Sequence, residues 1–152
     1  MENKQQNVES FKVKDYTTHI SASRTQSEIE EMLVKAGAEA IMKTYRGDGR
    51  TDALTFKYQG RGYKLPSNTE KCIEVLKGIK EYRNKDRFWL SEQAERVAWR
   101  VIRDWLDAQL SLIQIGQAEV EQVMLPYMWN GRQSLYDVMK EQRFALPNSK
   151  SE

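Results

Sequence analysis

Cationic and tyrosine side chains are interleaved in the stretch from residue 43 to residue 64. This stretch holds six Lys or Arg residues against two Asp residues, a net charge of +4. Cations bind phosphates and aromatic rings stack on bases, so the combination is typical of a surface that binds nucleic acid. The residues that we expect to form this surface are Lys43, Arg46, Arg50, Lys57, Tyr58, Arg61, Tyr63 and Lys64.

A second set of cations has helical spacing. Arg96, Arg100 and Arg103 recur at steps of four and three, which places their guanidinium groups along one side of a helix. Such a row could hold a run of phosphates. Arg100 can also pair with Asp104, and Arg103 with Asp107, as surface ion pairs worth about 0.3–0.5 kcal/mol each. We favour the ion pairs and keep the phosphate site as the alternative.

A third group, Tyr127, Met128 and Trp129, precedes an Asn130-Gly131 turn. These residue types are enriched at the centres of protein interfaces, and a position beside a turn favours exposure. Residues 104–152 also carry seven acidic against four basic side chains, a net charge of −3. This group indicates a second function class, a protein-interaction module such as an inhibitor or accessory factor.

Residues suited to catalysis or metal binding are scarce. The chain has one histidine, His19, and one cysteine, Cys72, with no spacing that implies a catalytic triad. Cys72 falls at an apolar helical position, which predicts a small core residue. No zinc or calcium motif appears, and the glycines fall between strands, whereas phosphate-binding loops precede a helix. We therefore expect no catalytic site, no metal and no cofactor.

A small sheet is expected to position the first set of cations. In residues 52–58, Leu54, Phe56 and Tyr58 alternate with polar residues, which predicts a strand with one buried face. The opposite face would carry Thr44, Thr55, Lys57, Lys64 and His19, either as an ordinary solvated surface or as the binding platform. The expected order is β-α-β-β-β, with strands at 16–23, 39–45, 52–58 and 63–65 and a helix from 25 to 37.

The helical part that follows is organised on one long helix. Apolar residues recur at steps of three and four between Ser91 and Gly116, with Ser91 as the expected cap and Trp105 as a core anchor. Shorter helices are expected at 67–79, 118–124 and 134–142. The predicted fold class is therefore α+β, a small antiparallel sheet followed by a helical part.

The length of 152 residues predicts a single domain. Within it we expect a flexible arm at 1–14, the sheet part at 16–65, the helical part at 67–142 and a flexible tail at 146–152. No apolar run approaches the roughly 20 residues that span a bilayer, and the first residues lack the apolar core of a signal peptide. We expect a cytoplasmic protein that does not bind membranes.

Two segments of the chain are EIEEMLVKAGAEAIMKTYRGDGRTDALTFKYQGRGYKLP and ERVAWRVIRDWLDAQLSLIQIGQAEVEQVMLPYM. They resemble small uncharacterised proteins of phages, prophages and related mobile elements, and the resemblance covers roughly residues 17–130. It implies a viral or mobile-element context and brings no activity, ligand or catalytic residue. The leading hypothesis is a non-catalytic nucleic-acid-binding protein. The alternative is the protein-interaction module, which in the context that the resemblance implies would act on a host protein.

Overall fold

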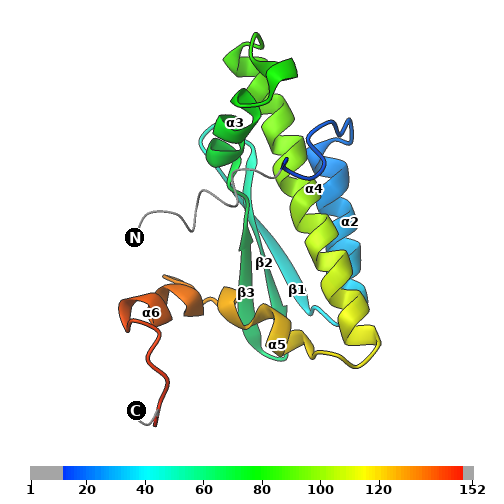
Figure 1. Cartoon of the computed structure of the whole chain (residues 1–152). Coiled ribbons are helices and arrows are strands. Elements are labelled where there is room, and N and C mark those ends of the chain that lie inside the picture. Colours follow the sequence, from blue (N-terminus) through cyan, green and yellow to red (C-terminus); the bar gives the residue numbers. More distant parts are fainter. Residues whose placement is uncertain (1–11, 149–152) are drawn as a thin grey trace. The chain divides into compact units, whose positions relative to one another are not determined.

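The computed structural model describes residues 12–148, and Figure 1 shows their helices and strands in chain order. The strands are β1 (Ala40–Tyr45), β2 (Thr51–Tyr58) and β3 (Arg61–Pro66). The helices are α2 (Ala22–Lys35), α3 (Thr69–Lys77), α4 (Arg87–Gln114), α5 (Val120–Met124) and α6 (Leu135–Glu141), with short 3-10 helices η1 (Lys80–Tyr82) and η2 (Leu125–Tyr127). The predicted α+β class, with a small antiparallel sheet and one long helix, is confirmed.

The described residues form two compact units. Unit 1 comprises the described residues up to Ile29 and the segment Ser67–Leu106, and unit 2 comprises Glu30–Pro66 and the described residues from Asp107 onward. The prediction of a single domain stays a prediction.

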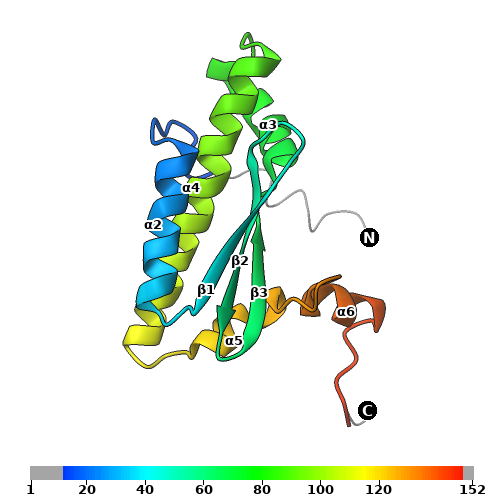
Figure 2. The same ribbon diagram turned by 180° about the vertical axis from the view of Figure 1, so that it is seen from behind.

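The sheet of unit 2 is antiparallel in the order β1-β2-β3, as Figure 2 shows. Side chains alternate between its faces as expected, because successive residues of a strand point in opposite directions. One face carries the buried residues Leu54, Phe56, Tyr63 and Leu65. The other face, which we call the lysine face, carries Met42 of β1, Thr55 and Lys57 of β2, and Lys64 of β3.

Two turns join these strands. Gln59 and Gly60 connect β2 to β3 with φ angles of 51° and 76°, the positive values of a two-residue hairpin turn. In the turn between β1 and β2, the Asp48 carboxylate accepts a hydrogen bond of 2.9 Å from the Arg50 backbone N–H. The glycine-rich hairpins that the sequence predicts are therefore confirmed.

The residues that follow η2 lie along β3, an edge strand of the sheet. Met128 pairs with Tyr63 as an isolated antiparallel bridge, and the Trp129 N–H donates to the Gly62 carbonyl over 2.8 Å. Ser134 then caps α6 by accepting from the Asp137 N–H over 3.2 Å, as the sequence predicts. Trp129 is thereby held beside β3 by backbone hydrogen bonds.

Unit 1 has an apolar core between α3 and the first half of α4. Its fully buried residues are Ile73, Leu76, Leu90, Ala94 and Val97. An aromatic cluster flanks them, in which the ring centroids of Tyr82 and Trp89 are 4.8 Å apart. Cys72 packs against the same core, as predicted, and burial raises the pKa of its thiol to about 11. A thiol with such a pKa is protonated and unreactive at neutral pH.

Residues 16–23 do not form the predicted strand. Tertiary hydrogen bonds from Tyr82 Oη and Gln93 Nε2 occupy the Tyr16 carbonyl, at 2.9 and 3.0 Å. The Ser21 hydroxyl accepts from the Arg24 N–H over 3.2 Å, and α2 therefore begins at Ala22. β-Branched residues favour a strand locally, but here this cap and contacts distant in sequence decide the conformation. The observed order is α-β-β-β.

The long helix α4 begins four residues before the predicted start at Ser91. The Asp86 carboxylate accepts from the Trp89 N–H over 2.8 Å and so caps a helix that runs from Arg87 to Gln114. Gly116, with a φ of 77°, follows its end as expected. Trp99 is completely buried, whereas Trp105, the expected core anchor, is half-buried.

The predicted arm at 1–14 and the predicted tail at 146–152 lie partly within the described region. Residues 1–11 of the expected arm and 149–152 of the expected tail lie outside the described residues. Val13 packs against the core of unit 1, and Lys14 Nζ lies 3.3 Å from an Asp104 carboxylate oxygen. Residues 13 and 14 are therefore part of unit 1 rather than of a loose arm.

Candidate functional site

The lysine face of unit 2 is the surface on which sequence-predicted binding residues come together. Across the sheet, Met42 pairs with Thr55 and Thr55 pairs with Lys64, so the three side chains form one row. Lys57 lies opposite Ala40 and Gly62 in the neighbouring row. Met42 is 57% exposed and therefore adds apolar surface to this face.

A shallow apolar hollow of about 290 Å³ lies on this part of the sheet. Gly60 and Gly62 contribute only backbone to its lining, which leaves room for a ligand close to the strands. The lining residues are Ala40, Ile41, Met42, Thr55, Phe56, Lys57, Gly60 and Gly62. Because it is shallow and open, the hollow suits a flat group that lies on the sheet rather than an enclosed small molecule.

Trp129 holds one of the two lysines in place. The Lys64 ammonium nitrogen lies 4.2 Å from the centroid of the Trp129 ring, within the range of a cation–π contact. The ammonium thereby covers one face of the indole, and the backbone bond from Trp129 to Gly62 fixes the ring itself. Trp129 therefore positions Lys64. Lys57 is exposed and makes no ion pair with any residue of the described region.

Three residues that the sequence places with the binding surface lie on the buried face instead. Lys43 Nζ is 3.0 Å from a Glu30 carboxylate oxygen, so its charge is paired. The Tyr63 ring is fully buried and stacked on Phe56 at 5.3 Å between centroids, and burial raises the pKa of its hydroxyl. Tyr63 therefore has no ring face available to a base.

Tyr58 is the third residue on the buried face. It is half-buried beside Gly37, where an added Cβ would lie 3.2 Å from a carbon of the Tyr58 ring. The strand alternation that correctly assigns Leu54 and Phe56 to the core also assigns Tyr58, Tyr63 and Lys43 to this face.

The arginines at the hairpin turns have acidic neighbours. Arg46 Nε lies 3.7 Å from an Asp48 carboxylate oxygen, and the backbone hydrogen bond from Arg50 lowers the pKa of that carboxyl. Arg61 is 4.0 Å from Glu121 of α5. These exposed pairs are weak, but they reduce the positive potential that Arg46 and Arg61 contribute.

The row of arginines on α4 is paired as well, with partners that differ from those predicted. Arg100 is hydrogen bonded to Glu28 of α2 rather than to Asp104. Arg103 lies 3.7 Å from Glu28 and 3.3 Å from the neighbouring Asp104. Arg96 is 3.9 Å from Glu92 on its own helix. The row thus joins α4 to α2 within unit 1 and is a poor candidate for binding phosphates.

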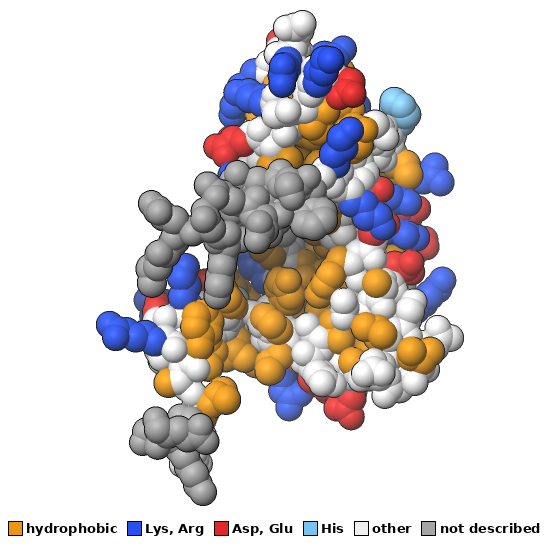
Figure 3. Space-filling model, viewed as in Figure 1, with side chains coloured by type: hydrophobic (Ala, Val, Ile, Leu, Met, Phe, Trp, Pro, Cys, Tyr) orange, Lys and Arg blue, Asp and Glu red, His pale blue; other side chains and the backbone are white. Residues whose placement is uncertain are grey.

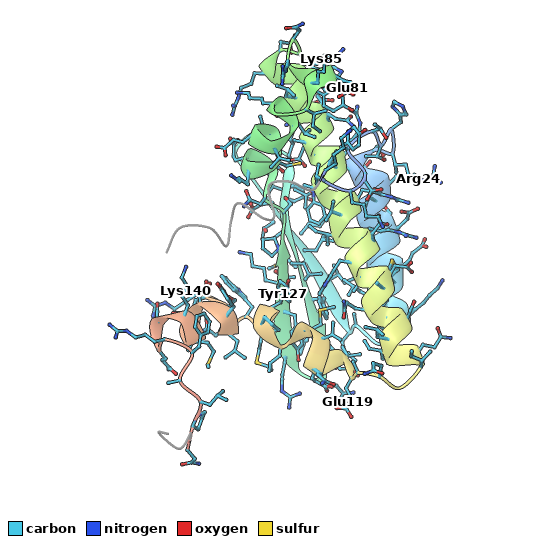
Figure 4. The ribbon with its side chains drawn as sticks, viewed as in Figure 1. Arg24, Glu81, Lys85, Glu119, Tyr127 and Lys140 are labelled. Carbon is cyan, nitrogen blue, oxygen red and sulfur yellow. The ribbon has the colours of Figure 1, made fainter. Side chains whose placement is uncertain are left out.

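The predicted partner-binding group is part of the sheet edge. Met128 bridges to Tyr63, and Tyr127, which Figure 4 labels between α5 and α6, is half-buried on η2. Trp129 is half-buried too, rather than fully exposed. The sequence did not indicate that Trp129 would reach Lys64, because that contact depends on how residues after η2 return to β3.

The described residues offer neither a metal site nor a helix that could span a bilayer. No group of three or more His, Cys, Asp or Glu residues among them is placed to hold a metal ion. Within the same residues, every helix is too short or too polar to cross a membrane.

Comparisons with known proteins add no assignment. No protein-family model, no curated protein and no solved structure matches this chain.

Proposed function

We propose that the protein is a non-catalytic nucleic-acid-binding protein that holds a single strand on the lysine face of its sheet. The observation that carries this proposal is the cation pair of Lys57 and Lys64 beside an exposed apolar hollow. Phosphates would contact the two ammonium groups, and a base would lie in the hollow against Met42. A single strand fits better than a duplex, because paired bases do not present a free ring face.

The size of the site limits the affinity that we expect. Two cations neutralise two phosphates, which corresponds to a slope of log K against log salt of about −1.4 for a single strand, at about 0.7 for each phosphate. Stacking on an apolar surface adds about 1–3 kcal/mol for each base, and every base can supply it. The lysine face is therefore expected to bind weakly and with little sequence preference.

Fluorescence anisotropy with a labelled oligothymidylate tests this proposal. The double substitution Lys57→Gln, Lys64→Gln is expected to remove the contribution of about 1.4 to the salt slope. The control is Lys35→Gln, Lys140→Gln, which removes the same charge from two exposed positions of unit 2 and should leave the slope unchanged. Binding with an unaltered slope after loss of both face lysines would refute the proposal.

The competing function is a protein interaction at the same sheet. β1 is an edge strand, and its Met42 and Tyr45 are 57% and 64% exposed. Extended peptides add to such edges by backbone hydrogen bonds. A parent protein that binds no oligonucleotide at low salt, but captures a host protein through Tyr45 and Met42, would favour this alternative. We further propose that the protein acts in the cytoplasm and in the context of a mobile element.

A further inference from the structure

Cations also cluster at one end of unit 1, in the segment that joins α3 to α4. We call residues 77–88 the basic tip. It contains five Lys or Arg residues against two acidic ones, and all five cations are exposed. Lys and Arg side chains gather at this end in Figure 3, and Figure 4 labels Lys85 there beside Glu81. The five cations are Lys77, Lys80, Arg83, Lys85 and Arg87.

Most of this charge has no acidic partner among residues 12–148. Lys77, Lys80 and Arg83 make no ion pair with another residue of the described region. Arg87 lies 3.0 Å from Glu70, whereas Lys85 lies over the Trp89 ring at 4.9 Å. The tip therefore differs from the arginine row of α4, in which each guanidinium has an acidic neighbour.

An exposed aromatic ring stands among these cations. Phe88 is 73% exposed, although it is next to Trp89, which is half-buried against the core. It lies in the first turn of α4, and Leu90 in the same turn is anchored in the core with Ile73. The ring is thus carried on a fixed helix end, and its exposure serves no packing purpose within the described residues.

We infer that the basic tip is a second nucleic-acid-binding surface, in which Phe88 stacks on a base and the surrounding cations bind phosphates. This inference rests on the proposed function for the class of ligand but uses a different surface. An anionic bilayer would also attract the cations. It is the poorer fit, because Phe88 is the only ring of the tip that is exposed, and interfacial binding needs a larger apolar area.

Three variants of the full chain test the inference. The binding of each to the labelled oligothymidylate is measured over about 50–200 mM salt. Lys77→Gln, Lys80→Gln, Arg83→Gln is expected to lower the salt slope by about 2, at about 0.7 for each phosphate. Phe88→Ser is expected to weaken binding about 5- to 150-fold without changing the slope, because stacking involves no counterion. The control is Arg24→Gln, Lys35→Gln, Arg132→Gln, which removes three exposed cations elsewhere. It should leave both the salt slope and the affinity unchanged.

The outcomes separate the two surfaces. Loss of binding in the tip variants with normal binding in Lys57→Gln, Lys64→Gln would support the tip and refute the lysine face. The reverse result would refute the tip. A parent protein that binds no oligonucleotide at low salt overturns both, and binding of phosphatidylserine-containing vesicles that depends on Phe88 would then assign the tip to a membrane surface. Circular dichroism of each variant verifies folding.

Discussion

Replacing Asp15 by Asn is expected to stabilise unit 1 at neutral pH and to remove a pH dependence of its stability. Burial, together with the hydrogen bond and the charge of Asp104, raises the pKa of the Asp15 carboxyl from 3.8 to about 6. Below pH 3.8 the carboxyl is protonated in both the folded and the unfolded chain. Between about pH 4 and pH 6 only the unfolded chain loses the proton, so the contribution of Asp15 to the free energy of unfolding falls as pH rises.

The magnitude follows from this difference in pKa. A change from 3.8 to about 6 corresponds to about 3 kcal/mol, at about 1.36 kcal/mol for each pKa unit. Asp15 is partly solvated, and screening reduces the value, so we expect about 1 kcal/mol. Asn removes the charge and also tolerates the backbone at this position, where φ is 63°.

Urea denaturation followed by tryptophan fluorescence, from about pH 4 to about pH 8, measures this effect. Asp104→Asn is the matched control. Burial alone would raise the pKa of Asp104, but hydrogen bonds with Asp15, Lys14 and Arg103 outweigh it and lower that pKa. Asp104→Asn should therefore destabilise the protein above about pH 4. Two results would refute this prediction: Asp15→Asn being less stable than the parent at pH 8, or a difference in free energy of unfolding between the two proteins that stays constant from about pH 4 to pH 6.

Two further predictions concern packing and backbone. Trp99→Ala is expected to lower the free energy of unfolding by about 3–5 kcal/mol, because Trp99 is completely buried. Trp105→Ala should cost clearly less, because Trp105 is half-buried. Equal losses for the two variants in urea denaturation would contradict this difference in burial. Gly60→Ala should cost about 1–2 kcal/mol because φ is 76° there, whereas Gly47→Ala, at a position with no positive φ and no atom within 4 Å of the added Cβ, should be nearly neutral. Thermal unfolding of the two variants checks this, and equal midpoint temperatures would count against a strained turn at Gly60.

The charge pattern of the sequence overstated the binding surface. It placed eight residues of the 43–64 stretch together, yet Lys43, Tyr58 and Tyr63 belong to the buried face, and Arg46 and Arg61 have acidic neighbours. A count of cations cannot show which of them are neutralised, because the partners Glu30 and Glu121 are distant from the stretch in sequence. The lysine face keeps Lys57 and Lys64.

Features set by neighbouring residues were predictable from the sequence. The alternation in β2 identified the buried face through Leu54 and Phe56, since a strand exposes alternate side chains on opposite faces. The Gln59-Gly60 turn, the Ser134 cap and the left-handed Gly116 were predictable for the same kind of reason. Each depends on the conformational preference or hydrogen bonding of residues close together in the chain.

Tertiary structure decided the features that depend on distant partners. Residues 16–18 have strand-forming side chains, but Gln93 and Tyr82 take their carbonyl groups and the predicted strand does not form. Arg100 pairs with Glu28 rather than with the nearer Asp104, and Lys64 lies over Trp129 only because residues 128–129 return to β3. These contacts join residues that are far apart in sequence. The interactions that stabilise them form only when the chain has folded, so a local sequence pattern does not reveal them.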